Sequence, residues 1–250
     1  MAELTLLVDL GNTRFKWVTC AQGGLSEPCY QVRSGAREVT ALVQAWQPLE
    51  PSRIVAASVL DKAFENRLAA EVSRELGVCV EWVRVPAAGH GIRVAYTDPA
   101  QLGVDRFVAM VGAREHQCGA CVIVDCGTAV TIDALDESGR HRGGLILPGP
   151  GLMRKALCRG TAGIGATGRR QESGLFARDT ETAISAGVIR TVAAAIDHIS
   201  SDMGQILGAE TVRILTGGDG EQILPLLGGR YCYDPVLTLR GLAAMSCRER

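Results

Sequence analysis

The sequence predicts an α/β protein made of two similar halves with a ligand-binding cleft between them. Each half begins with an apolar strand, a tight turn and a second β-rich run, and continues with alternating helices and strands. The first strand of each half ends in an Asp-x-Gly turn, within residues 8–13 and again within residues 124–129. A duplicated unit of this kind brings its matching turns to one cleft. The expected halves are residues 1–117 and 118–250.

Apolar runs bounded by turn residues predict the strands of the first half. We expect these strands at residues 4–9, 14–20, 29–33, 53–58 and 78–85. Segment 61–76 repeats apolar residues at four-residue spacing and stops at Gly77, which predicts an amphipathic helix with a glycine terminator. Asp98 and Pro99 supply an N-cap and a first-turn proline, and so predict a helix that reaches about residue 115.

The second half restarts the same pattern. We expect its strands at residues 121–125, 129–135, 142–147 and 212–216. A glycine-rich stretch follows over residues 149–174, and no helix or strand is assigned to it. The longest helix should begin near Asp179 and Thr180 and run to about Ile199, and residues 241–245 should form a short final helix.

Composition bounds the class of protein. The 250 residues are 47% hydrophobic and 21% charged, which is typical of a globular protein rather than a disordered one. A net charge of −1 gives no electrostatic case for binding nucleic acid or an anionic membrane surface. No apolar run approaches the ~18–20 residues of a membrane span, so no membrane-spanning segment is expected. Nine cysteines, several inside apolar strands, suggest buried thiols in a reducing compartment, so we expect a cytoplasmic protein.

Four short patterns that can mark a functional site are not expected to do so here. Residues 163–168 match G-x-G-x-x-G but follow no predicted strand, so a dinucleotide fingerprint is not expected. The same stretch is followed by Arg169 rather than Lys-Ser/Thr, so it is no P-loop. The basic pair Arg169 and Arg170 reads as a solvated loop. The C-x-x-C at Cys118–Cys121 has no second pair and enters a strand, so neither a metal nor a redox role is expected.

The first Asp-x-Gly turn has the residues that a nucleotide phosphate tail requires. Gly11 allows backbone N–H groups to approach phosphates, and Asn12 can donate to a phosphate oxygen. Asp9 can hold Mg²⁺, usually through water. Lys16, on the strand after the turn, would act as a point charge near the phosphates. The alternative is a plain β-turn with an edge lysine.

The second turn, Asp125–Thr128, faces the same two interpretations. Thr131 and Asp133 continue a polar face along the following strand, which favours a binding role. The segment 143–149 is either part of the same site or merely a strand between turns.

Asp105 and Arg106 lie in the first turns of a predicted helix. They form either an exposed helical ion pair or part of a cleft in which Asp105 is the general base for a hydroxyl nucleophile.

Taken together, six motifs in order over nearly the whole chain resemble the type III pantothenate kinase family. They are Asp9-x-Gly-Asn-Thr-x-x-Lys-Trp, Leu102-Gly-x-Asp-Arg, Asp125-x-Gly-Thr-Ala-x-Thr-x-Asp, Gly143-Gly-x-Ile-x-Pro-Gly, Asp179-Thr-x-x-Ala-Ile-x-x-Gly and Thr216-Gly-Gly-Asp. The family belongs to the acetate and sugar kinase/Hsp70/actin superfamily, whose two RNase H-like (actin-like ATPase) halves clasp ATP. The resemblance implies ATP-dependent phosphorylation of the primary hydroxyl of pantothenate, the first step of coenzyme A synthesis.

The resemblance also implies roles for individual residues. Those expected to bind ATP are Asp9, Leu10, Gly11, Asn12, Thr13, Arg14, Phe15, Lys16, Thr128, Gly217 and Gly218. Those expected to contact pantothenate are Tyr96, Gly103, Val104, Asp105 and Arg106, with Asp105 as proton acceptor. Asp9 would lie near Mg²⁺, and Asp125 would bind an activating monovalent cation, K⁺ or NH₄⁺. Thr180 would either contact substrate across a homodimer interface or only cap its helix.

Two rival functions remain open on the sequence. One is a sugar or acetate kinase of the same superfamily, which the Asp105-Arg106 pair in its motif disfavours. The other is a regulatory or transcription-accessory protein that kept the fold and lost catalysis. The sequence argues against such decay, because it keeps the residues of the expected site: Asp9, Lys16, Asp105, Asp125 and Thr128.

Overall fold

A computed structural model describes residues 4–22, 24–33, 35, 37–116, 119–161 and 174–247. These residues divide into two compact units. The first unit contains the described residues up to His116 together with those from Val236 onward, and the second contains Gly119 to Pro235. The glycine motif at 163–168, the Arg169-Arg170 pair and Cys118 lie outside the described residues.

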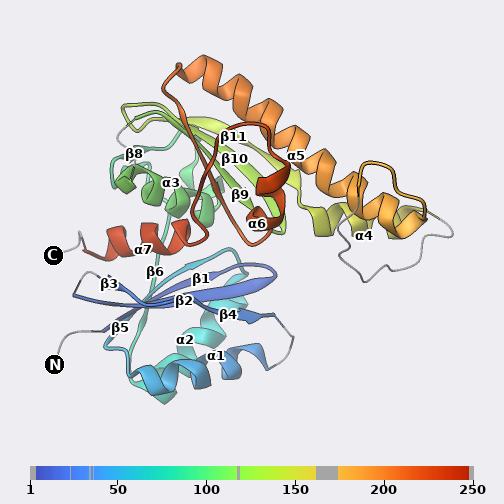
Figure 1. Ribbon diagram of the computed structural model, residues 1–250. Helices are drawn as coiled ribbons and strands as arrows, with labels where there is room; N and C mark the ends of the chain where they lie inside the picture. Colours follow the sequence, from blue (N-terminus) through green and yellow to red (C-terminus); the bar gives the residue numbers. More distant parts are fainter. Residues whose placement is uncertain are drawn as a thin grey trace. The chain divides into compact units, whose positions relative to one another are not determined.

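The first unit is built on one mixed sheet (Figure 1). Its strands are β1 (Thr5–Leu10), β2 (Arg14–Ala21), β3 (Gly24–Leu25), β4 (Cys29–Val32), β5 (Arg53–Ser58) and β6 (Val80–Trp82). The central strand β1 pairs antiparallel with β2 and parallel with β5, and β5 continues in parallel to β6. Strands β3 and β4 both pair antiparallel with β2. A small separate hairpin joins β7 (Ala88–Gly89) to β8 (Ile92–Arg93).

Two pairs of helices complete the first unit. Helices α1 (Glu38–Trp46) and α2 (Lys62–Leu76) bury Trp46, Phe64 and Leu68 in one core with side chains of β1, β2 and β5. Helices α3 (Val104–His116) and α7 (Leu237–Cys247) pack against each other, α3 contacts β5, and α7 contacts β1. The two helices approach so closely that a Cβ on Gly112 or Gly241 would collide with the backbone of the other helix, so glycine at these positions permits the contact.

The second unit repeats this plan. Its sheet contains β9 (Cys121–Cys126), β10 (Ala129–Leu135), β11 (His141–Pro148), β12 (Val212–Thr216) and β13 (Cys232–Tyr233), in the order β11-β10-β9-β12-β13. The sequence of antiparallel and parallel pairings matches β4-β2-β1-β5-β6 in the first unit. The expected duplication of a meander followed by parallel strands is therefore confirmed. Helices α4 (Pro150–Gly160), α5 (Thr180–Leu207) and α6 (Gly220–Ile223) complete the unit.

The structure departs from the expected elements in several places. Helices α1 and α4 lie where no helix was expected, and α4 begins at Pro150 inside the glycine-rich stretch. The helix expected from residue 98 is divided into a 3₁₀ turn (Pro99–Gln101) and α3, which begins only at Val104. Asp98 does act as a cap, but of the 3₁₀ turn, where its Oδ1 accepts from the N–H of Ala100 at 3.0 Å.

The last helix changes the domain assignment. Helix α7 is longer than the expected 241–245 and belongs to the first unit, whereas the sequence placed it in the second half, 118–250. Its buried residues, among them Leu239 and Leu242, complete the side of the first unit formed with α3.

Helix α5 qualifies the expectation that no segment could span a membrane. By length and composition α5 passes as a membrane helix, with mean hydropathy 1.2 over its most apolar window, a third of which is buried. Its apolar face has another explanation, because Val192, Ala193 and Ile196 lie in the core of the second unit with β9 and β10.

The burial of the cysteines also differs in part from expectation. Those that are buried are Cys20, Cys121 and Cys126, while Cys29, Cys79, Cys232 and Cys247 are exposed.

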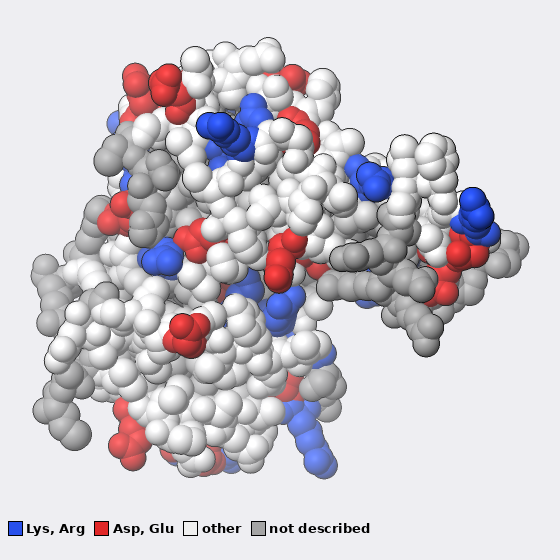
Figure 2. All heavy atoms as spheres, viewed as in Figure 1, with Lys and Arg blue, Asp and Glu red and all other residues white. Residues whose placement is uncertain are grey.

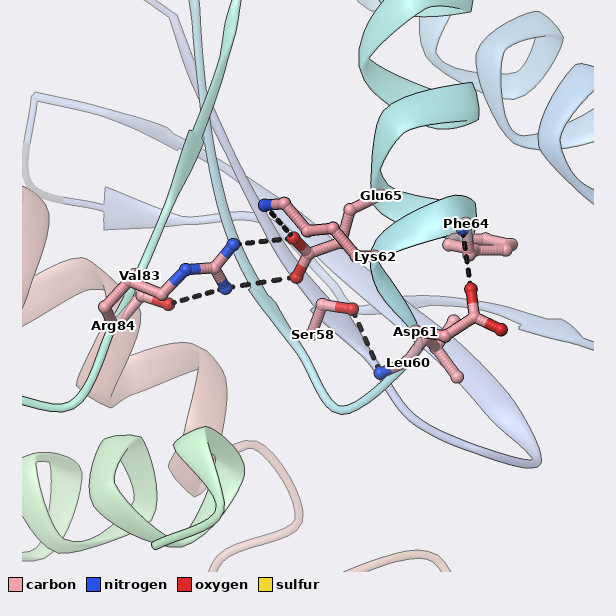
Figure 3. A network of polar contacts seen from close by, with 8 residues as sticks. All are labelled: Ser58, Leu60, Asp61, Lys62, Phe64, Glu65, Val83 and Arg84. Atoms are coloured by element: carbon pink, nitrogen blue, oxygen red, sulfur yellow. Dashed lines mark hydrogen bonds and ion pairs between the residues drawn. The ribbon is translucent and has the colours of Figure 1, made fainter. Parts of the chain in front are cut away.

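A polar network holds the loop after β5 at the carboxyl edge of the first sheet (Figure 3). The buried carboxylate of Glu65 accepts from Arg84 Nη1 at 3.0 Å and Nη2 at 2.6 Å, and from Lys62 Nζ at 2.8 Å. Asp61 caps α2 by accepting from the N–H of Phe64 at 2.7 Å. Burial alone would raise the pKa of Glu65, but the hydrogen bonds from Arg84 and Lys62 outweigh it and lower that pKa. The network thus stabilises the edge at which β1 and β5 both end.

Candidate active site

The first Asp-x-Gly turn joins β1 to β2 at the carboxyl edge of the first sheet. Asp9 lies directly opposite Lys16 across the two strands, and the N–H of Gly11 closes the turn on the carbonyl of Arg14 at 3.2 Å. A Cβ on Gly11 would lie 2.9 Å from that carbonyl oxygen, so the tight turn requires glycine. Asn12 and Thr13 are exposed at the tip. Leu10 and Phe15, also expected in the phosphate loop, are buried as core residues, and the binding of phosphate by this turn stays a prediction.

Asp9 has a partner that the sequence did not suggest. Thr238 Oγ1, on α7, donates to Asp9 Oδ2 at 3.1 Å, and Thr238 is itself buried. Burial raises the pKa of Asp9, while the charge of Lys16 and the hydrogen bond from Thr238 act in the opposite direction. Thr238 is 229 positions away from Asp9 and belongs to no phosphate motif, so no pattern in the sequence could have identified it.

The expected pantothenate contacts converge at the start of α3. The Arg106 guanidinium carbon lies 5.7 Å from the centre of the Tyr96 ring, and Nη1 donates to the Tyr96 hydroxyl at 3.0 Å. Asp105 Oδ1 accepts from the N–H of Arg106 at 2.8 Å. A Cβ on Gly103 would lie 2.5 Å from Asp105 Oδ1, so a larger residue there would displace the Asp105 carboxylate. Arg106 is only 5% exposed, so the alternative of an exposed helical ion pair is wrong.

The second turn lies at the equivalent edge of the second sheet. Asp125 lies between Thr131 on β10 and Thr216 on β12, its direct neighbours in register. The N–H of Gly127 donates to the carbonyl of Ala129 at 2.9 Å. The N–H of Gly149 donates to the carbonyl of Thr128 at 3.1 Å. A Cβ on Gly149 would collide with this turn, so the end of the 143–149 segment supports the turn rather than serving only as a strand.

Asp133 behaves differently from the polar face that the sequence suggested. It is 2% exposed and lies 2.9 Å from His141 Nε2 on β11, inside the second unit. Of the two residues expected to continue the polar face, Thr131 is the one placed beside Asp125.

Gly217 and Gly218 follow β12 next to Asp125. Gly217 has φ +93°, and a Cβ there would collide with the Asp125 carboxylate and the backbone of Cys126. The N–H of Asp219 donates to the carbonyl of Cys126 at 2.9 Å, which holds this turn over the end of β9. Gly218 is exposed. The structure therefore brings Asp125, Thr128 and the glycine pair to one edge of the second unit.

Thr180 is the first residue of α5 and is exposed. The helix is capped by Asp179, whose Oδ1 accepts from the N–H of Thr182 at 2.9 Å. The alternative role of Thr180 as the N-cap is therefore wrong, and its contact with substrate across a dimer stays a prediction.

The carboxylates fit the cations that the resemblance implies. Within the described residues no group of three or more His, Cys, Asp and Glu side chains is placed to hold a metal ion. A single carboxylate is nevertheless what a nucleotide-bound Mg²⁺ takes from protein, because phosphate oxygens and water supply the other ligands. Asp9 suits this role, since burial penalises its charge and a nearby cation would offset that penalty. Asp125, with a threonine on each neighbouring strand, offers the oxygen donors that a hard monovalent cation prefers.

Comparison with solved structures defines the class. A Campylobacter jejuni protein described as a Baf family transcriptional activator superposes with TM-score 0.58 at 21% identity, covering 95% of this chain and 94% of that one. A glucokinase from an Antarctic psychrotroph gives TM-score 0.51 at 11% identity, covering 98% of this chain and 99% of that one. Identities this low establish the fold alone. With the duplicated sheets and the two Asp-x-Gly turns, they define a protein of the actin-like ATPase fold.

The sequence comparisons then define the family. The model of type III pantothenate kinase matches residues 5–202. The chain belongs to the type III pantothenate kinase family. A type III pantothenate kinase of Nitrosococcus oceani is 37% identical over 97% of this chain and 94% of its own length. That of Halorhodospira halophila is also 37% identical, over 98% and 99% of the two chains.

Proposed function

We propose that this chain transfers the terminal phosphate of ATP to the primary hydroxyl of pantothenate, with Asp105 as the general base. Membership of the type III pantothenate kinase family over nearly the full length supports an ATP-dependent kinase of coenzyme A biosynthesis. The observation that carries the assignment of the base is the arrangement at the start of α3. There Asp105 is partly buried beside Arg106, which is itself held by Tyr96.

The residues of the chain supply what phosphoryl transfer needs. Such a reaction asks for an in-line hydroxyl and for neutralised phosphate oxygens, with little covalent chemistry from the protein. Lys16 and the backbone N–H groups of the turn at Gly11 provide positive charge and donors in the first unit. The turn at Gly127 and Thr128 provides donors in the second. Asp105 orients the hydroxyl of pantothenate and accepts its proton.

Two cations complete the proposal. Mg²⁺ bound near Asp9, through water, would neutralise charge on the phosphates. A monovalent cation, K⁺ or NH₄⁺, would bind at Asp125. Gly217 and Gly218 would lie along the nucleoside, where a side chain would obstruct the base.

Tyr96, Gly103, Val104 and Arg106 would bind the pantothenate. Val104 is buried and contributes through the backbone at the start of α3, whereas the buried guanidinium of Arg106 suits a carboxylate. A homodimer, in which Thr180 reaches the partner's substrate, and a cytoplasmic location belong to the same proposal.

The rival functions have weaker support. The likeness to a protein described as a transcriptional activator is at 21% identity and reflects the fold alone. On the face drawn in Figure 2, basic and acidic side chains are interspersed rather than gathered into a broad basic field. A basic field is the electrostatic footprint expected for nucleic-acid binding.

A panel of phosphoryl acceptors tests the function. Purified protein with ATP, Mg²⁺ and K⁺ would be given pantothenate, acetate or glucose, and ADP formation would be followed in each case. Of the three acceptors, we expect only pantothenate to raise ADP formation above background. Turnover with acetate or glucose instead would assign the chain to another kinase of the superfamily, and no turnover with any acceptor, by folded protein that binds ATP, would favour the regulatory role.

A further inference from the structure

Arg33 follows β4 immediately and contacts the first Asp-x-Gly turn, although it belongs to none of the six sequence motifs. Its own N–H donates to the carbonyl of Thr13 at 3.0 Å, and its Nη1 donates to the carbonyl of Asn12 at 3.3 Å. These two carbonyls belong to the exposed tip of the turn, and β4 runs alongside through its pairing with β2. The main chain and the side chain of one residue thus hold two successive peptide groups of the turn.

The guanidinium is fixed on its other sides. Arg33 Nε and Nη2 donate to the two carboxylate oxygens of Glu38 at 3.1 and 2.9 Å, and Glu38 is 6% exposed in the first turn of α1. The guanidinium carbon also lies 5.7 Å from the ring centres of both Phe15 and Phe64. A bidentate pair and two aromatic contacts leave the side chain little freedom, so Nη1 is presented to Asn12 in one orientation.

Holding those carbonyls determines the direction of the amides. A trans peptide is planar, so its C=O and N–H groups point in opposite directions. When the carbonyls of Asn12 and Thr13 point to Arg33, the N–H groups of Thr13 and Arg14 point away from it. Phosphate loops depend on the direction of their backbone N–H groups, because those groups are the donors to the phosphates.

We propose that Arg33, locked by Glu38, is a positioning residue that orients the backbone of the Asn12–Thr13 turn for the phosphates of ATP. The inference rests on the proposed function only for the identity of the nucleotide. Its sequence signal was weak, because Arg33 is 21 positions from Asn12 and α1, which carries Glu38, was not predicted.

The variant R33K tests this role with little risk to folding. Lysine keeps a positive charge beside the buried Glu38 carboxylate, but it lacks the planar fork of three nitrogens with which Arg33 reaches both Glu38 oxygens and the Asn12 carbonyl. The matched control is R67K. Arg67 lies 5.8 Å from the centre of the same Phe64 ring, so the identical substitution there perturbs the same aromatic ring.

We expect R33K to raise the KM for ATP and the Kd for MgATP by about 10-fold, in line with the loss of a hydrogen bond from a charged donor. The KM for pantothenate and the melting temperature should change little, and R67K should leave all four quantities near those of the unaltered protein. A second variant, E38Q, should raise the same two ATP quantities by a smaller factor because it loosens the guanidinium without removing it.

An R33K protein with unaltered affinity for MgATP would overturn the inference. So would equal increases in both KM values, since these would indicate a general loosening of the unit. The Kd for MgATP is measured without pantothenate, so this test can be read separately from the proposed function. Unaltered protein that binds MgATP but forms no phosphorylated pantothenate would contradict the function, and the ratio of the Kd values of R33K and unaltered protein would still decide the role of Arg33.

Discussion

Asp9 and Asp125 occupy equivalent places on the central strands of the two sheets but have different neighbours. Asp9 lies opposite Lys16, whereas Asp125 lies between Thr131 and Thr216. A carboxylate beside an ammonium suits a site where phosphates and their divalent metal share charge with the protein. A carboxylate flanked by threonines suits a singly charged cation that needs neutral oxygen donors. The duplication therefore places a carboxylate at the same position in both units. The residues on the neighbouring strands, Lys16 in the first unit and two threonines in the second, give the two turns different chemistry.

Asp105→Asn tests the proposed base. Asparagine can still accept from the N–H of Arg106 but cannot take the hydroxyl proton, so kcat should fall by ~10²–10⁴ while ATP binding is largely retained. The measurement is steady-state kinetics together with nucleotide affinity. Turnover equal to that of the unaltered protein would remove Asp105 from this role.

Asp9→Ala tests the proposed Mg²⁺ contact. The Mg²⁺ concentration needed for half-maximal activity should rise by roughly tenfold, which corresponds to about 1.4 kcal/mol. A titration that matches the unaltered protein would count against Asp9.

The charge of Asp9, which should help the protein bind Mg²⁺, should lower the stability of the ligand-free fold. A carboxyl whose folded pKa lies above its unfolded value costs stability once it ionises, so at neutral pH the burial of Asp9 destabilises the ligand-free fold. Asp9→Asn, which keeps the shape, should therefore leave the ligand-free melting temperature the same or higher. A clear decrease would mean that the charge of Asp9 stabilises the unit.

Helix α2 illustrates how an element at the edge of the sheet depends on one buried charge. Glu65→Gln should destabilise the protein by about 1–2 kcal/mol at neutral pH, because Gln leaves the hydrogen bonds from Arg84 and Lys62 weakened. Since Arg84 and Lys62 are largely exposed, solvent screening keeps this effect below that of a fully buried pair.

The same substitution carries a pH signature. The folded pKa of Glu65 is below its ordinary value of 4.5, so its contribution to stability is complete above that value and is lost as the pH falls through the folded pKa. Chemical denaturation at a series of pH values should show the difference between Glu65→Gln and the unaltered protein shrinking below about pH 4.5. A difference independent of pH would show that the charge of Glu65 is not its cause.

The elements that the sequence predicted are those with strong periodicity or a clear terminator. Helix α2 has regular apolar spacing and Gly77 at its end, with Gly77 in the left-handed conformation that favours glycine. Helices α1 and α4 were missed for opposite reasons. Segment 38–46 is short, with interspersed β-branched residues, and α4 starts at Pro150 within a stretch rich in glycine. A proline in the first turn is compatible with a helix, so glycine content alone misled the interpretation.

At the scale of the whole molecule, the residues of the candidate site also divide into those that the sequence predicted and those that it did not. Motifs in the sequence predicted both turns, the Gly103–Arg106 segment and the glycine pair after β12, because each has local turn chemistry. Thr238 and Arg33 could not be predicted, because each contributes through a contact between segments distant in sequence. The return of α7 to the first unit, which brings Thr238 to Asp9, is likewise a property of the packing of α3 against α7. Local patterns thus indicated the residues proposed to react, and the tertiary fold supplied the side chains that contact them.

The most direct test of the whole account is to identify the product. Purified protein would be incubated with pantothenate, ATP and Mg²⁺ in two matched reactions, one containing K⁺ and one containing Na⁺ in its place, and 4′-phosphopantothenate would be measured by mass spectrometry. The account predicts 4′-phosphopantothenate in the K⁺ reaction and much less in the Na⁺ reaction. Equal product with either ion would refute the cation role of Asp125, and no product in either reaction from folded, ATP-binding protein would contradict the central claim.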